Sequence, residues 1–376
     1  MIVFCDVNTI WRRKFFDALA AKTTALGIAP SHWAIARRRR YPLKATETPS
    51  TSILEIALPP GWASRTAWLG QRILWRRILK ASLAMGEKPT VLVITSPHYV
   101  TLLKIIPESL KTFYYASDDY RSYEGWGGNH MAIMERQVVR RVDHSFFVSD
   151  GLVKRARQEY DVDPARISLS MNATETRFFS SADGNGVPSE LPIGQLLRPI
   201  VGVVGGINER LDLCLLRACA DMPALGTLLL VGPIQQKPAD DLRQLLAHPK
   251  CVSAGHQPHE QLHKWLKCLD VALIPYKETT LNRYCSPMRL FDHMASGVPI
   301  VATNACEQVM TFADIIEVCG DSRCFLEKLE KYCVSYASID GRRCVRVRRA
   351  YENTWQHRAD AILERQWRIN EVCTQH

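Results

Sequence analysis

The chain has 376 residues, of which 47% are hydrophobic and 23% charged, so it is globular and long enough for two domains. Its net charge of +10 is uneven: residues 1–190 hold 26 Lys and Arg against 18 Asp and Glu, whereas residues 191–376 hold 22 against 20. We therefore expect the first half to meet something anionic, such as a membrane surface, a phosphate-bearing substrate or nucleic acid. The 12 cysteines show no zinc-ligand spacing, and no apolar run reaches the ~18 residues of a membrane-spanning helix. We expect no signal peptide, because the apolar start MIVFC is short and is soon followed by Arg12 and Arg13. A cytoplasmic protein with reduced cysteines is expected.

The first half alternates short apolar runs with amphipathic stretches, which is typical of buried parallel strands separated by helices. The expected strands are MIVFC (1–5), TVLVIT (90–95), TFYYAS (112–117) and HSFFVS (144–149), and the expected helices are 62–85, 129–141 and 151–159. The segment 180–199 is rich in Ser, Gly and Pro and is predicted to be a linker.

The second half repeats the alternation. Its expected strands are 200–206, 227–232, 271–276 and 299–303, and its expected helices are 209–221, 237–247, 259–268, 286–296 and a basic helix over about 346–370. The pattern predicts an α/β fold with two Rossmann-like domains, whose parallel sheets face across a cleft and whose C-terminal helix has room to cross back to the first domain.

The stretch SPMRLFDHMASGVPIVAT (286–303) carries the clearest chemical signal. Ser286 is a suitable N-cap and Gly297 ends the predicted helix. Arg289 and Asp292 are three residues apart and share a helix face. A helix N-terminus with an arginine suits a diphosphate, and a carboxylate one turn later can accept hydrogen bonds from ribose hydroxyls. The same residues also fit a plain helix with a surface Arg–Asp pair.

Glycine-containing turns surround this helix in the sequence. The run IVGVVGG ends in Gly205 and Gly206, a polar loop follows Gly255, and the run VALIPY ends in Tyr276. Together with the stretch 286–303, and in this order, these segments resemble the C-terminal domain of the GT-B glycosyltransferases of the bacterial group 1 type. The resemblance covers most of 200–303.

The first half resembles the family more loosely, at YYASDD, HSFFVSDGL and ISLSMNATETRFF. Within the family the chain most resembles the xanthan glucuronosyltransferase type, which has a similar ASD after its aromatic strand. Arg289 replaces the usual lysine, and Asp292 replaces a glutamate or glutamine. Tyr284 stands where the Glu-x7-Glu motif of retaining members has its first glutamate, which argues against a standard retaining site.

The resemblance implies a nucleotide-sugar donor, a UDP-sugar by expectation, and neither a metal nor another cofactor. Arg289 and the amides near Met288 would hold the diphosphate, and Asp292 would contact the ribose. The implied donor-site residues are Gly205, Gly206, Arg210, His256, Tyr276, Ser286, Met288, Arg289 and Asp292. The expected domains are an acceptor and membrane-side domain at 1–190, a nucleotide-sugar domain at 191–350 and a C-terminal helix at 351–376.

Two adjacent carboxylates, Asp118 and Asp119, follow the aromatic strand of the first half. Asp118 matches the aspartate that is the general base of the xanthan enzyme, and an inverting transfer needs one carboxylate to take the proton of the acceptor hydroxyl. Asp119 is expected to cap the next segment or to orient its neighbour, and a capping role for both acids stays open. His98 follows another strand and is a third candidate, for contact with the sugar or acceptor; a structural role is its alternative.

The helix expected at 62–85 is amphipathic and basic. One side carries Trp68, Leu74, Trp75, Ile78 and Leu79, and the other carries Arg65, Arg72, Arg76, Arg77 and Lys80. Such a helix suits an anionic bilayer surface, whereas a helix packed on the sheet with a solvated basic face is the alternative. The run ARRRR (36–40) adds positive charge nearby.

These features predict a glycosyltransferase that moves a sugar from a nucleotide sugar to a lipid-linked saccharide in bacterial surface or exopolysaccharide synthesis. We expect an inverting, metal-independent enzyme, peripheral on the cytoplasmic face of the plasma membrane. A retaining GT-B enzyme with a different acceptor is the first alternative. A basic nucleic-acid-binding protein is the second, and the absence of a recognisable nucleic-acid module argues against it.

Overall fold

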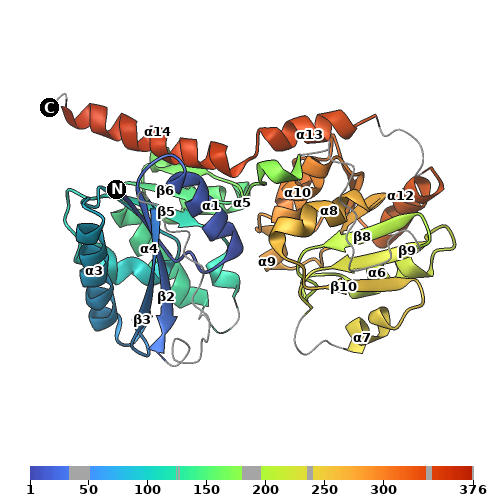
Figure 1. Ribbon diagram of the computed structural model, residues 1–376, viewed down its shortest axis with the longest axis horizontal. Helices are drawn as coiled ribbons and strands as arrows, with labels where there is room; N and C mark the ends of the chain where they lie inside the picture. Colours follow the sequence, from blue (N-terminus) through green and yellow to red (C-terminus); the bar gives the residue numbers. More distant parts are fainter. Residues whose placement is uncertain are drawn as a thin grey trace. The chain divides into compact units, whose positions relative to one another are not determined.

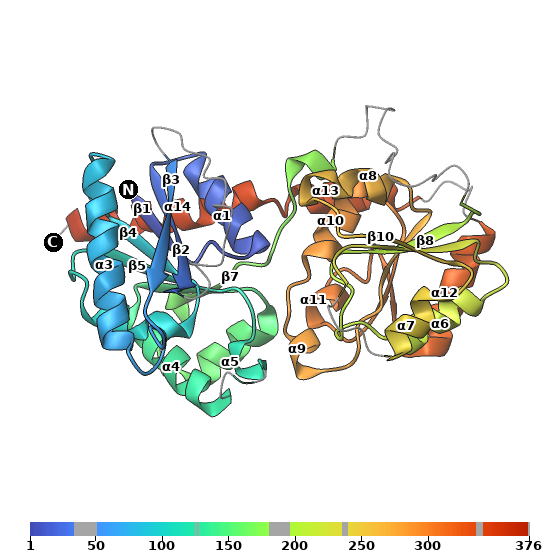
Figure 2. The same ribbon diagram turned by 60° about the horizontal axis from the view of Figure 1, so that its bottom comes forward.

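The chain folds into two compact units (Figures 1 and 2). The computed structural model describes residues 1–33, 51–123, 125, 128–179, 196–234, 240–335 and 341–374, with side chains as far as Arg365. The first unit comprises Met1–Asn172 and Trp355–His376, and the second comprises Ala173–Thr354. These bounds differ from the expected 190 and 350. The segment after residue 172 pairs with the end of the second unit, where Thr174 N–H donates to the Asn353 carbonyl at 3.0 Å.

The first unit is built on a seven-stranded parallel sheet. In spatial order its strands are β3 (Thr51–Leu58), β2 (Ala25–His32), β1 (Ile2–Cys5), β4 (Val91–Ile94), β5 (Lys111–Ala116), β6 (His144–Phe147) and β7 (Ile167–Leu169). The order runs outward from β1 and β4, so the switch point where such sheets bind ligands lies between these two strands. All four strands expected in this half are present, and β2, β3 and β7 were not predicted.

Helices cover this sheet. They are α1 (Ile10–Ala20), α3 (Ala67–Ala84), α4 (Gly128–Arg141), α5 (Asp150–Glu159) and α14 (Trp355–Thr374), with the 3-10 segments η1 (Pro97–Lys104), η2 (Tyr120–Ser122) and η3 (Pro164–Arg166). The final helix α14 packs on α1, as expected for a helix that crosses back to the first domain (Figure 1). The rings of Phe15 and Trp355 lie 5.9 Å apart, and Lys22 pairs with Asp360 at 2.7 Å.

The second unit repeats the arrangement with six parallel strands. In spatial order they are β10 (Cys251–Gly255), β9 (Thr227–Val231), β8 (Ile200–Val204), β11 (Val271–Ile274), β12 (Ile300–Thr303) and β13 (Glu317–Cys319). Its switch point lies between β8 and β11. The expected α/β fold with two parallel sheets is confirmed, and the four strands expected in this half are present.

The helical elements of this unit are η4 (Thr176–Phe178), α6 (Leu213–Asp221), α7 (Asp240–Leu246), η6 (His259–Gln261), α8 (Leu262–Lys267), α9 (Thr280–Arg283), α10 (Met288–Ser296), α11 (Glu307–Met310), α12 (Ser322–Val334) and α13 (Arg343–Tyr351). The basic helix expected at 346–370 is wrong as one element. It is divided into α13 and α14, because Asn353 caps the first by donating to the Arg349 carbonyl at 2.8 Å. The helix expected from 209 begins at Leu213, because the Asp212 carboxylate accepts from the Leu215 N–H at 2.9 Å.

Two further expectations can be placed. Most of the predicted linker 180–199 and all of the ARRRR run at 36–40 lie outside the described residues. In the part of the chain that the structure describes, no helix is both long enough and apolar enough to span a bilayer.

Candidate active site

Arg289 lies in the first turn of α10 and contacts both sides of the switch point of the second sheet. Its Nη2 donates to the Gly206 carbonyl oxygen at 2.8 Å, in the turn that follows β8. Its guanidinium carbon lies 5.4 Å from the ring centre of Tyr276, just after β11. Burial is the main cause that raises the pKa of Tyr276 to about 12, so its hydroxyl stays neutral. The structure therefore brings together Gly206, Tyr276 and Arg289, as the sequence predicts.

Gly205 occupies a position where a side chain would be strained. Its φ is +118°, and a Cβ there would lie 3.0 Å from Arg289 Nη2. At the end of the neighbouring strand β9, a Cβ on Gly232 would lie 2.1 Å from the Gly205 carbonyl oxygen. The two turns thus cross with bare backbone beside the arginine, the arrangement that lets backbone approach a phosphate.

The charge of Arg289 is only partly compensated by the protein. Its Nη1 is buried and has no hydrogen-bond partner among the described residues. A buried charged donor without a partner costs about 1–3 kcal/mol or more. An anion bound beside Nη1 removes that cost, and the planar guanidinium matches phosphate oxygens. The residues present therefore fit a diphosphate.

Four other predicted donor-site residues, namely Ser286, Met288, Arg210 and His256, take no part in the Arg289 contacts described above. Ser286 is buried but is not the N-cap as expected, because Pro287 takes that position and α10 begins at Met288. The Arg210 backbone is fixed, since its carbonyl accepts from Asn282 Nδ2 at 3.0 Å. His256 is exposed after β10. Donor contacts of these residues stay predictions.

Asp292 is held by Thr174, through a contact that the sequence did not predict. Its Oδ1 accepts from Thr174 Oγ1 at 2.7 Å, and its Oδ2 lies 4.0 Å from His259 Nε2. The other ring nitrogen of His259 lies 3.1 Å from Glu175 Oε1. The predicted ribose ligand is therefore also a structural anchor for residues 174–178. Thr174 and Glu175 lie in the stretch ISLSMNATETRFF, but the sequence did not indicate their contacts with Asp292 and His259, because these residues are far apart in sequence.

His293 lies fully buried one residue after Asp292. Burial, with Arg289 adding to it, lowers the pKa of His293 to about 3, and the Val204 backbone opposes that shift. The imidazole of His293 is therefore neutral. It contributes no charge next to the arginine.

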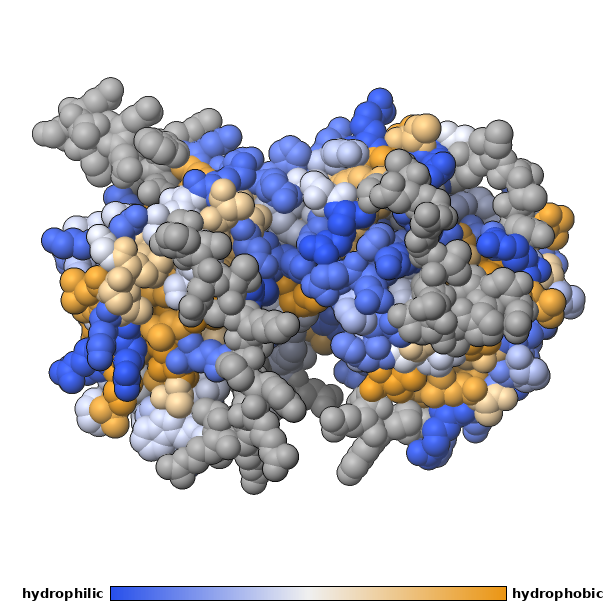
Figure 3. All heavy atoms as spheres, in the orientation of Figure 1, coloured by the Kyte–Doolittle hydropathy of each residue, from blue (hydrophilic) through white to orange (hydrophobic). Residues whose placement is uncertain are grey.

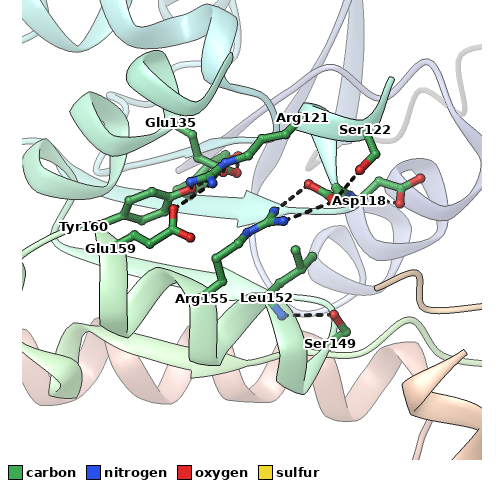
Figure 4. Close-up of polar contacts among 11 residues, drawn as sticks. Asp118, Arg121, Ser122, Glu135, Ser149, Leu152, Arg155, Glu159 and Tyr160 are labelled. Atoms are coloured by element: carbon green, nitrogen blue, oxygen red, sulfur yellow. Dashed lines mark hydrogen bonds and ion pairs between the residues drawn. The ribbon is translucent and has the colours of Figure 1, made fainter. Parts of the chain in front are cut away.

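Asp118 and Asp119, at the end of β5 in the first unit, have different partners (Figure 4). Asp118 Oδ1 accepts from the Asp119 N–H at 3.0 Å, and its Oδ2 accepts from the Tyr123 hydroxyl at 2.6 Å. The Asp119 carboxylate is paired with Arg155 at 2.5 Å and accepts from Ser122 Oγ at 2.7 Å. Asp119 makes no side-chain cap to η2, and its role in orienting Asp118 stays a prediction.

His98, the third candidate, lies near an acid that the sequence did not single out. Burial lowers the pKa of His98, and the carboxylate of Asp6 opposes that shift. Asp6 directly follows β1 with a φ of 71° and pairs with the buried Arg12. Asp6 and His98 thus follow β1 and β4, the strands that flank the switch point of this sheet. The signal that could have found Asp6 is the one that found Asp118, an acid at a strand end.

The exposed face of α3 differs from the predicted division into apolar and basic sides. Leu74 and Ile78 are fully buried against the first unit, so they are not membrane-facing. The exposed face instead mixes apolar side chains with basic ones (Figure 3). Its apolar members are Trp68 (60% exposed), Leu69, Leu79 and Leu83 (75% exposed), and its basic members are Arg72, Arg76, Arg77 and Lys80.

Two parallel sheets, each in its own unit and each with functional candidates at a switch point, define the GT-B fold class of glycosyltransferases. Residues 198–331, within the second unit, match the family model described as "Glycosyl transferases group 1". Within the described ranges no three His, Cys, Asp or Glu side chains form a metal-binding group.

Comparison with individual proteins agrees with this class. The chain is 25% identical over 170 residues to a protein of Bacillus subtilis (strain 168) named as the teichuronic acid biosynthesis glycosyltransferase TuaH. The match spans 45% of this chain and 42% of that protein, which is less than half of each. A sucrose-phosphate synthase of Thermosynechococcus elongatus has the same fold, with a TM-score of 0.72, 14% identity and 99% of each chain covered. The Anabaena protein HepE, in complex with UDP and glucose, has a TM-score of 0.68 and 12% identity, with 97% of this chain and 98% of that chain covered.

Proposed function

We propose that this protein is a glycosyltransferase that uses a UDP-sugar as donor. The observation that carries the proposal is the Arg289 guanidinium, which lies against the bare backbone of Gly205 and whose buried Nη1 has no hydrogen-bond partner among the described residues. A diphosphate bound there would gain a charge-assisted contact at the moment when the leaving group develops negative charge. UDP is the favoured nucleotide because the Anabaena relative of the same fold binds UDP.

We further propose that transfer is inverting and needs no metal. Asp118 would take the proton of an acceptor hydroxyl as its oxygen attacks the anomeric carbon, while the bond from that carbon to the diphosphate breaks and UDP leaves. The support is the position of Asp118 at a strand end and the tyrosine at 284 in place of a glutamate. The same two features favour the xanthan glucuronosyltransferase type over a retaining enzyme.

The proposed acceptor is a saccharide on a lipid diphosphate, used in surface polysaccharide synthesis at the cytoplasmic face of the plasma membrane. Two observations support it. The exposed face of α3 combines Trp68 and Leu83 with basic side chains, which suits an anionic headgroup layer. The Bacillus relative is named for teichuronic acid biosynthesis.

Thermal unfolding in the presence of nucleotides tests the donor class. A ligand that binds only the folded state stabilises it by about 2.7 kcal/mol at a hundred times its Kd. We expect UDP, and one UDP-sugar in particular, to raise the melting temperature more than GDP, ADP or dTDP. If no nucleoside diphosphate stabilises the protein while an oligonucleotide does at the same salt concentration, the nucleic-acid alternative is correct.

A further inference from the structure

Arg155 forms a bidentate ion pair with the fully buried carboxylate of Asp119. Its Nη2 lies 2.5 Å from Asp119 Oδ1 and its Nη1 lies 3.2 Å from Asp119 Oδ2. The Asp119 side chain has no exposed surface, and Arg155 is 18% exposed. Figure 4 shows Arg155 extending from α5 toward the end of β5, beside Asp118 and Ser122. The N-terminus of α5 is itself fixed, because the Ser149 side chain accepts a hydrogen bond from the Leu152 N–H.

This ion pair is connected to Asp118 by a single backbone amide. The N–H of Asp119 donates to Asp118 Oδ1 at 3.0 Å, so the position of Asp119 determines where that hydrogen bond points. The Tyr123 hydroxyl donates to the second oxygen, Oδ2, at 2.6 Å. The two donors hold both oxygens of the Asp118 carboxylate, and one of them depends on Arg155.

Charge gives the ion pair a second effect. Two neighbouring carboxylates disfavour each other's ionised form. Arg155 compensates the charge of Asp119, the more deeply buried of the two. The titratable and charged groups near this pair are Tyr120 and Tyr123 beside the acids, Arg121 on η2, Glu135 on α4, and Glu159 and Tyr160 at the end of α5. Of these, Arg121 is engaged with Glu159 and Tyr160. Arg155 is therefore the cation that pairs with Asp119.

We propose that Arg155 is a positioning residue for the transfer reaction, which acts on the base Asp118 through Asp119. It fixes the backbone amide that orients the Asp118 carboxylate, and it compensates the negative charge of Asp119 next to that carboxylate. This inference rests on the proposed function of Asp118. It also explains why two acids stand side by side: one reacts, and the other links it to a cation.

The test compares pH–rate profiles of the full-length protein with the UDP-sugar found by the thermal screen. The variants are Arg155→Met, Arg155→Lys, and the double variant Arg155→Met with Asp119→Asn, which removes both charges but keeps the amide. Arg157→Met on the same helix is the control, since Arg157 donates to the Ile167 carbonyl and does not contact Asp119. Melting temperatures establish that each variant is folded.

We expect Arg155→Met to lower kcat by about 10- to 100-fold with donor KM unchanged, because a small displacement of a catalytic group costs up to about 100-fold. Its acid limb should move to higher pH, because the charge of Asp119 is then uncompensated, and the double variant should return the limb to the wild-type position. Arg155→Lys should show a smaller loss without the shift, and it replaces Arg155→Met if that variant does not fold.

Two results would overturn the inference, and they differ in cause. If Asp118→Asn abolishes turnover but Arg155→Met and Arg155→Lys keep the wild-type kcat and acid limb, the base is correct and the positioning role is wrong. If Asp118→Asn turns over at the wild-type rate, the base assignment fails and the role of Arg155 fails with it. A merely structural arginine would lower the melting temperature without moving the acid limb.

Discussion

Thr174 donates a 2.7 Å hydrogen bond to Asp292, 118 residues further along the chain, and both side chains are buried. The bond joins the segment that opens the second unit to the helix that carries Arg289. A carboxylate that the sequence assigns to ribose therefore also anchors backbone next to the donor site. His259 lies between this carboxylate and Glu175, which ties a third segment to the same group.

Thr174→Val removes the donor and keeps the shape. The variant leaves a buried acceptor without this partner, which costs about 1–3 kcal/mol. We expect the free energy of unfolding to fall by this amount, which lowers the urea concentration at the unfolding midpoint. Thr176→Val, at an exposed position on the same segment, is the control and should change stability by less than about 0.5 kcal/mol. Equal midpoints for the two variants would show that the Thr174–Asp292 bond is not stabilising.

Arg289→Ala removes the proposed diphosphate contact. A hydrogen bond to a charged group is worth about 1.5–3 kcal/mol, so the UDP affinity measured by calorimetry should fall by about 10- to 150-fold. The matched control is Arg283→Ala, since that arginine precedes the same helix but is 62% exposed. Unchanged UDP affinity in Arg289→Ala would place the nucleotide elsewhere.

The α3 surface predicts binding to anionic vesicles. Reversing Arg72, Arg76 and Lys80 to glutamate should remove on the order of 3 kcal/mol of attraction, at about 1 kcal/mol per basic residue. Sedimentation with phosphatidylserine vesicles at low salt should then be lost, and high salt should weaken binding of the wild type. Reversing Arg217, Arg323 and Lys331, which lie on the second unit, makes the same net change and should leave binding intact. If wild type stays in the supernatant at low salt, the surface does not bind membranes.

His293 predicts an acid-sensitive second unit. Its pKa in the folded state is about 3, below the ordinary 6.5, so below pH 6.5 the unfolded chain binds a proton that the folded chain does not. The stability present above pH 6.5 is therefore lost as the pH falls toward 3, with a slope of up to about 1.4 kcal/mol per pH unit.

His293→Gln cannot take that proton, so its urea midpoint should depend less on pH between 6.5 and 5 than the wild-type midpoint does. His130→Gln, which removes an exposed histidine, is the control. Parallel pH dependences for His293→Gln and wild type would contradict the assignment.

The sequence predicts those parts of this protein that depend on local patterns. Runs such as TFYYAS and VALIPY are apolar over a whole strand, because a parallel strand is buried on both faces. Strand β3 was missed because its exposed face includes Glu55, which breaks the apolar run. Arg289 and the Gly205–Gly206 turn were found because a helix start and paired glycines leave a signature within a few residues.

Contacts between distant residues left no such signature. Arg155 and Asp119 are 36 residues apart, and Thr174 and Asp292 are 118 apart. The α3 helix shows a related limit: its periodicity correctly predicts a helix, but Leu74 and Ile78 pack inward rather than toward a membrane. Periodicity gives an apolar face and does not say what that face contacts.

The turnover of Asp118→Asn tests the central claim most directly. The amide keeps the shape of the side chain but cannot take a proton, so kcat with the UDP-sugar and a lipid-linked acceptor should fall by about 100- to 10,000-fold, the usual worth of a general base. UDP affinity should stay at the wild-type value, because the nucleotide is proposed to bind the second unit. A kcat for Asp118→Asn equal to that of the wild type would contradict the account.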